Sequence, residues 1–171
     1  IPAMGMDPAE FWGRVREFTE ETGSDKILGY LYMMMKISRE KGIKMTREFL
    51  NEMGKNIKFF PGVSTWFKRI NDFGAEHGIQ VEHYIISSGN KEIIDGCQIA
   101  KEFKMVYGCE FIYDSVSGEA IWPKMAVNYT QKTQYFYRIS KGVIDVTDDK
   151  TINEKTSSKR IPTSNMIYIG D

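Results

Sequence analysis

The chain has 171 residues, enough for one hydrophobic core with a small additional unit. Its 23 Lys and Arg residues balance 23 Asp and Glu residues, so it carries no net charge that would attract nucleic acid or an anionic membrane. No apolar stretch approaches the ~20 residues that cross a bilayer. The first residues lack the pattern of a signal peptide, which predicts a cytoplasmic location.

The cysteines and histidines do not have the spacing of a metal site. Cys97 and Cys109 form no CxxC pair and have no nearby histidine, so we expect buried, reduced thiols. His77 falls at the end of a predicted helix and His83 precedes a predicted strand. We expect structural roles for both imidazoles.

Residues 1–56 predict helices and no strand. Asp7 is a good helix cap, followed by a proline and a nearby glutamate, and predicts a helix to about residue 21. Further helices are predicted over 26–41 and 46–55, separated by the helix-ending Gly42. We therefore expect an all-helical segment before the first strand.

After residue 56 the pattern alternates between strand and helix. This alternation predicts the α/β class, a Rossmann-like three-layer core over 57–171 with a parallel sheet, and residues 1–56 as a helical accessory. The predicted elements are a helix at 64–76, a strand at 84–86, a helix at 89–103, a β-hairpin of 105–114 with 120–124, a helix at 130–141, a polar loop at 145–160 and a buried strand at 166–169.

The strand at Tyr84 runs into two serines, a glycine and an asparagine before the next helix. Hydroxyl groups at a strand end and free N–H groups at a helix start both suit a phosphate. Ser87, Ser88, Gly89 and Asn90 are therefore candidate phosphate-binding residues. The alternative is that Ser88 only caps the following helix.

Two later positions add to this site. Lys132 lies in the first turn of the helix expected to be capped by Thr130, where a cation opposes the helix dipole unless an anion is near. It is a candidate phosphate ligand, or a lysine that extends into solvent. The strand at 166–169 ends on Gly170 and Asp171, and a carboxylate at a sheet edge suits Mg²⁺. A plain strand-to-loop turn is the alternative there.

The order of these residues resembles the haloacid dehalogenase (HAD) superfamily, in its phosphoserine-phosphatase-like branch. The resemblance implies that Ser87 binds the transferring phosphoryl group, that Lys132 offsets its charge and that Asp171 helps to hold Mg²⁺. Residues 1–56 would be the helical cap inserted into the α/β core. The implied activity is Mg²⁺-dependent hydrolysis of a small phosphorylated metabolite through an aspartyl phosphate.

The chain departs from this family at both ends. The first motif, DxDx(T/V), carries the nucleophilic aspartate, and no such motif follows an apolar strand here. We expect it upstream of Ile1, and we expect the present segment to be inactive and unstable without that central strand. The fourth motif also lacks the later aspartate of its GDxxxD form.

Two other functions stay open. One is a non-catalytic phosphate-binding or regulatory module with a HAD-like fold, which the absent nucleophile motivates. The other is a nucleotide-binding Rossmann protein, although its G-x-G-x-x-G motif is not present. Within the expected cap, a Met-rich and aromatic stripe either lines a substrate pocket or packs between helices. Its members are Tyr30, Tyr32, Met33, Met34 and Met35.

Overall fold

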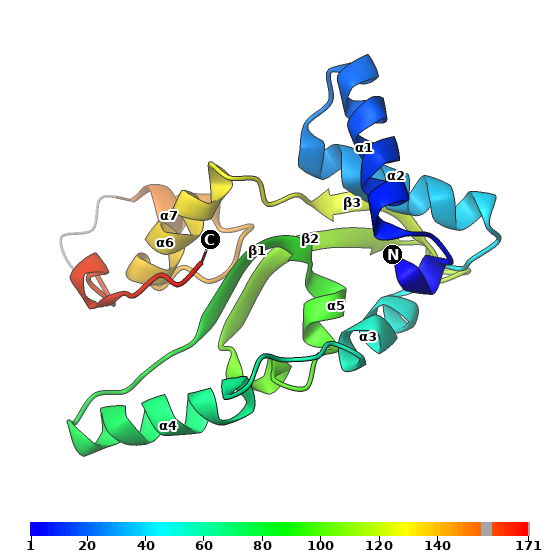
Figure 1. The fold of residues 1–171 in the computed structure, drawn as a ribbon. Helices are drawn as coiled ribbons and strands as arrows, with labels where there is room; N and C mark the ends of the chain where they lie inside the picture. Colours follow the sequence, from blue (N-terminus) through cyan, green and yellow to red (C-terminus); the bar gives the residue numbers. More distant parts are fainter. Residues whose placement is uncertain (155–158, 171) are drawn as a thin grey trace. The chain divides into compact units, whose positions relative to one another are not determined.

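The structure is a computed structural model that describes residues 1–154 and 159–170. The chain forms two compact units, Ile1–Val127 and Asn128–Asp171 (Figure 1). The first unit combines helices with a three-stranded sheet, and the second is helical in its described residues. The predicted α/β class is confirmed. The helices of residues 1–56 lie in the same compact unit as the sheet, and their division from it as a cap stays a prediction.

The first three long helices form where the sequence predicts them. They are α1 (Pro8–Thr22), α2 (Lys26–Glu40) and α3 (Arg47–Lys55), after a short 3₁₀ turn, η1 (Pro2–Met4). Asp7 and Asp25 each accept two main-chain N–H bonds at a helix start, and Thr46 accepts one from the start of α3. These local caps fix where the three helices begin.

The sheet has the strand order β1-β2-β3. Strand β1 (Tyr84–Asn90) runs parallel to β2 (Met105–Tyr113), and β3 (Ala120–Met125) pairs antiparallel with β2, which confirms the predicted hairpin. Ile86 pairs with Tyr107 and Asn90 with Cys109, so four steps along β1 match two along β2. Residues 87–89 therefore leave the regular ladder, and the backbone bulges there.

The helix predicted over 89–103 is wrong in its length. The chain forms a short α5 (Lys91–Asp95) and a 3₁₀ turn, η2 (Ala100–Glu102). The break follows Gly96, where an added Cβ would lie 2.0 Å from the main-chain oxygen of Asn51 in α3. A glycine disfavours helix and allows this backbone contact, so α5 ends there.

Helix α4 (Val63–Glu76) matches its prediction and carries both histidine contacts. His77 Nδ1 lies 2.8 Å from the main-chain oxygen of Phe73, and His83 Nε2 lies 2.9 Å from Asn71 Oδ1. Both contacts are structural. The two cysteines are buried and form no disulfide, as expected.

The second unit contains α6 (Gln131–Lys141), α7 (Asp149–Asn153) and the 3₁₀ turn η3 (Thr163–Asn165). Helix α6 ends at Gly142, as predicted, but Thr130 does not cap it. The side-chain Oδ1 of Asn128 accepts the N–H of Gln131 at 3.1 Å instead. Helix α7 falls within the predicted polar loop, because Asp148 caps it by accepting the N–H of Thr151.

The buried strand predicted at 166–169 is wrong. The segment adopts no strand, and Ile167 and Ile169 are 90% and 77% exposed. A strand needs a neighbour to pair its backbone groups, and no described strand pairs with this one. Asp171 lies outside the described residues. None of the described helices has the length and apolar character to span a membrane.

Candidate functional site

The residues predicted to bind phosphate lie together at the carboxyl end of β1. Ser87 Oγ accepts a hydrogen bond of 2.9 Å from the N–H of Gly89. This local turn occupies the hydroxyl oxygen as an acceptor, so its hydrogen is available for donation to a ligand. Gly89 is exposed, and a Cβ there would lie 3.1 Å from Ser87 Oγ.

Asn90, rather than Ser88, caps the following helix. Asn90 is 5% exposed, and its Oδ1 accepts the N–H of Ile93 at 3.3 Å. Its Nδ2 and the Ser88 Oγ are both buried with no hydrogen-bond partner among the described residues. Unpaired buried polar groups cost free energy, and a ligand or an ordered water that pairs with them removes that cost. The end of β1 therefore presents two buried side-chain groups, besides Ser87, that can bind oxygen atoms.

A tyrosine of α2 holds this strand end in place. The Tyr30 hydroxyl donates to the main-chain oxygen of Ser88 at 2.6 Å, and the Cys109 thiol contacts the same oxygen at 3.2 Å. Burial raises the Tyr30 pKa far above its usual value, and the nearby Cys109 and Glu92 raise it further. Tyr30 is therefore a neutral donor at physiological pH. The sequence placed it in the Met-rich stripe but gave no sign of this contact.

Cys109 lies under the same strand end. Burial raises the pKa of its thiol, with smaller contributions from the charges of Asp25 and Glu92, while the bond from the Val127 N–H and the adjacent Tyr30 hydroxyl oppose the rise. The thiol is protonated near neutral pH and is a poor nucleophile. At this position the buried thiol packs in the core and donates a hydrogen bond to the Ser88 oxygen.

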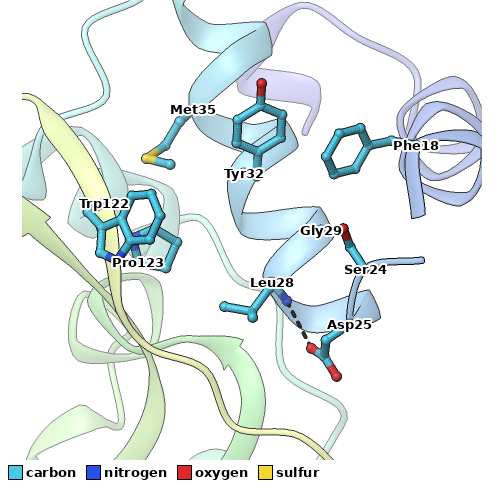
Figure 2. A pocket seen from close by; sticks show the side chains of 9 residues that line it. All are labelled: Phe18, Ser24, Asp25, Leu28, Gly29, Tyr32, Met35, Trp122 and Pro123. Carbon is cyan, nitrogen blue, oxygen red and sulfur yellow. Dashed lines mark hydrogen bonds between the residues drawn. The ribbon is translucent and has the colours of Figure 1, made fainter. Parts of the chain in front are cut away.

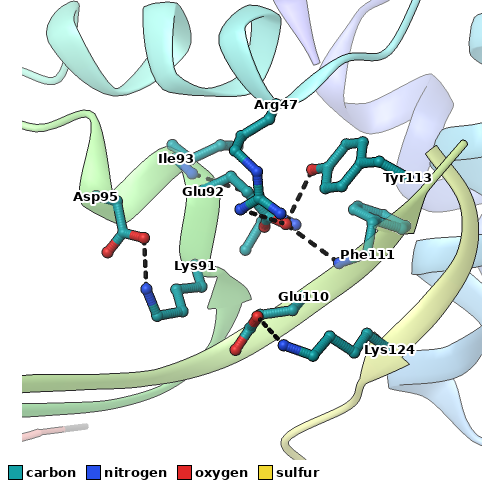
Figure 3. Close-up of polar contacts among 10 residues, drawn as sticks. Arg47, Lys91, Glu92, Ile93, Asp95, Glu110, Phe111, Tyr113 and Lys124 are labelled. Carbon is teal, nitrogen blue, oxygen red and sulfur yellow. Dashed lines mark hydrogen bonds and ion pairs between the residues drawn. The ribbon is translucent and has the colours of Figure 1, made fainter. Parts of the chain in front are cut away.

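A buried carboxylate connects α5 with β2 (Figure 3). Glu92 is 1% exposed, and its Oε1 accepts the N–H of Phe111 at 3.2 Å and the hydroxyl of Tyr113 at 2.8 Å. Its Oε2 has no hydrogen-bond partner among the described residues. Burial raises the pKa of Tyr113, and the adjacent Glu92 adds to the rise. Sequence reasoning missed Glu92, because a charged residue on a helix normally faces solvent.

Arg47 brings α3 to the same cluster. Its guanidinium lies 4.6 Å from the centroid of the Tyr113 ring, and its Nη1 lies 3.9 Å from Glu92 Oε1. The Arg47 side chain is about half exposed at the edge of the cluster, and its positive charge offsets the charge of the buried Glu92 carboxylate. Two helices of the expected cap, α2 and α3, therefore contact the segment from Ser88 to Glu92.

The other two predicted site residues lie in the second unit. Lys132 is half-buried in the first turn of α6, where its main-chain N–H donates to the main-chain oxygen of Asn128 at 3.3 Å. Asp171 follows the described residues. Across residues 1–154 and 159–170 no three His, Cys, Asp or Glu side chains gather as metal ligands. Magnesium binding by Asp171 therefore stays a prediction.

A pocket of about 300 Å³ opens beside α2 in the first unit (Figure 2). Tyr32 and Met35 of the predicted stripe line it, and every member of the stripe except Tyr32 is buried. Packing between helices is thus shown for part of the stripe, and a substrate-binding role for the pocket stays a prediction. The lining residues are Phe18, Ser24, Asp25, Leu28, Gly29, Tyr32, Met35, Trp122 and Pro123.

Comparison with known proteins gives no functional assignment. No family model and no solved structure matches the chain. An uncharacterized protein of Borreliella burgdorferi is 28% identical over 191 aligned positions, which cover 97% of this chain. The chain spans 65% of the length of that relative.

Proposed function

We propose that the complete protein is a Mg²⁺-dependent phosphomonoester hydrolase of the HAD type, which acts on a small phosphorylated metabolite through an aspartyl phosphate. The observation that carries the proposal is the cluster at the carboxyl end of β1. There Ser87 has a hydroxyl hydrogen to donate, and Ser88 and Asn90 have buried groups without partners in the described residues. Ligands of parallel α/β sheets bind at such strand ends.

The sheet edge adds support. In the described residues β1 pairs only with β2, and the apolar segment 166–169 pairs with no strand. The family resemblance implies a central strand that carries the nucleophilic aspartate and has a strand on each side. Such a strand would pair with the edge of β1 that no described strand occupies.

In the proposed reaction an aspartate outside these 171 residues attacks the phosphorus atom, and the alcohol of the substrate leaves. Water then hydrolyses the aspartyl phosphate and releases inorganic phosphate. Ser87 would donate to a phosphoryl oxygen, and Lys132 would offset the charge that builds up on the phosphoryl group. When bound, Mg²⁺ would supply further positive charge, with Asp171 among its ligands.

The helices of residues 8–55 fit the role of a cap. Tyr30 of α2 bonds to the Ser88 oxygen, and Arg47 of α3 lies beside Glu92, so both helices reach the segment that would bind phosphate. A cap in this position would exclude water and select the substrate. The free thiols of Cys97 and Cys109 fit a cytoplasmic location, where the environment is reducing.

The proposal is tested by assaying the complete protein on a panel of phosphomonoesters with Mg²⁺ and with EDTA. Ser87→Ala and Lys132→Ala should each lower kcat by about 10²-fold or more, because each removes one group that stabilises the transition state. Ser117→Ala and Lys150→Ala are matched controls at exposed positions and should leave kcat unchanged.

Turnover that does not need Mg²⁺, or full activity of Lys132→Ala, would contradict the proposal. Saturable phosphate binding without hydrolysis of any ester would instead support the non-catalytic phosphate-binding module.

A further inference from the structure

Three aromatic side chains from three elements surround the pocket of Figure 2. Phe18 comes from α1, Tyr32 from α2 and Trp122 from β3. The rings of Phe18 and Tyr32 stack with centroids 4.9 Å apart and an angle of 20° between their planes. Trp122 is 65% exposed and Tyr32 is 42% exposed. Exposed aromatic side chains around a concave surface are typical of a binding site.

The only charged side chain in the lining is that of Asp25. Its Oδ1 accepts the N–H groups of Ile27 and Leu28 at 2.9 and 3.0 Å, which fixes the carboxylate at the start of α2. The nine lining residues include no Lys, Arg or His. A carboxylate next to aromatic faces attracts a cation, and aromatic cages bind quaternary ammonium groups in this way. An anionic ligand would meet no positive charge in this lining, only the hydroxyl groups of Ser24 and Tyr32.

We infer that this pocket binds a small organic cation with a quaternary ammonium group. The cation would lie against Trp122 and Tyr32, with the Asp25 carboxylate as its counter-charge. A ligand with a carboxylate next to its ammonium group fits less well, because no basic side chain lines the pocket to receive the carboxylate.

The pocket and the candidate phosphate site are both bordered by residues of α2. Tyr30, which bonds to Ser88, is two residues from each of the lining residues Leu28 and Tyr32, so its side chain leaves α2 on a different face from theirs. Binding of the cation itself does not depend on catalysis.

The test is calorimetric titration of the complete protein with choline and with 3,3-dimethylbutan-1-ol, its neutral isostere. Choline should bind saturably, and at least tenfold more tightly than the neutral alcohol. Asp25→Asn removes the charge but keeps a residue that caps helices well, and Trp122→Leu removes an aromatic face. Each should weaken choline binding at least tenfold. Trp66→Leu on α4 is the matched control, since Trp66 is exposed but does not line the pocket.

Equal affinity for choline and its isostere, absence of saturable choline binding, or unchanged binding in both pocket variants would overturn the inference. The two proposals fail separately. Hydrolysis of phosphomonoesters without choline binding would overturn the inferred cation site and leave the hydrolase proposal standing. Choline binding without hydrolysis would support the site and count against the hydrolase.

Discussion

The hydroxyl of Tyr30 donates a hydrogen bond of 2.6 Å to the main-chain oxygen of Ser88. The two residues are 58 positions apart in the chain, and the bond joins α2 to the carboxyl end of β1. It fixes the backbone beside Ser87 and so positions the hydroxyl that we propose binds phosphate. The helical segment and the sheet therefore meet at the candidate site.

Tyr30→Phe should destabilise the protein by about 1 kcal/mol, because it removes one buried hydrogen bond and keeps the ring. The Ser88 oxygen is then left with the weaker Cys109 thiol as its donor. Urea denaturation measures the change. Tyr32→Phe makes the same chemical change at a half-exposed position and should alter stability by less than about 0.5 kcal/mol. Equal losses in the two variants would show that the Tyr30 bond contributes nothing.

Gly54→Ala should destabilise the protein by about 3 kcal/mol or more, because the added Cβ would lie 2.0 Å from the main-chain oxygen of Ile93. Helices α3 and α5 would have to move apart. Gly13→Ala is the matched control in α1, where a Cβ meets nothing within 4 Å. It should stabilise by about 0.5 to 1 kcal/mol, since alanine favours helix. Thermal melts of both variants check the pair, and a tolerated Gly54→Ala would rule out the close contact.

A substitution that removes only the charge of Glu92 should destabilise the protein less than one that also removes its hydrogen-bond acceptor. Glu92→Gln keeps an acceptor for the Phe111 N–H and the Tyr113 hydroxyl, and should cost less than about 1 kcal/mol. Glu92→Leu leaves both buried donors unpaired and should cost about 2 to 4 kcal/mol. Chemical denaturation of the two variants compares them. If leucine were the milder change, the hydrogen bonds would not be what holds this cluster.

The stability of the folded protein should fall as the pH drops below about 6.5, and His83 should contribute to this loss. Burial lowers the pKa of His83, partly offset by the charge of Glu102, so the folded state binds its proton less readily than the unfolded state does. Stability is then lost as the pH falls through the unfolded pKa toward the folded one.

Melting temperatures of wild type and His83→Gln between pH 7.5 and 5.5 test this dependence. The decline should be smaller in the variant, and His77→Gln, which removes the other imidazole, serves as the control. A steeper decline in His83→Gln would reverse the sign and contradict the account.

The parts of the fold that follow from local sequence were predictable. Asp7, Asp25 and Thr46 cap helices within three residues of themselves, so the starts of α1, α2 and α3 could be predicted from the chain. The length of α5 could not, because it depends on the contact of Gly96 with Asn51 in α3. The strand expected at 166–169 failed for a similar reason, since a strand forms only with a neighbour.

The candidate site shows the same division. The polar ending of β1 was visible in the sequence, and with it Ser87, Ser88, Gly89 and Asn90. The partners that organise it were not, because Tyr30 and Glu92 reach it across the fold. Their residue types gave no signal, since a tyrosine in an apolar stripe and a glutamate on a helix are common.

The most direct test of the hydrolase proposal is to trap its covalent intermediate. The complete protein is mixed with a ³²P-labelled phosphomonoester and Mg²⁺, quenched in acid within a single turnover, and analysed by peptide mapping with and without hydroxylamine. We predict a hydroxylamine-labile label on an aspartate outside these 171 residues, reduced in Lys132→Ala. Turnover of the ester with no label on any aspartate would contradict the proposal.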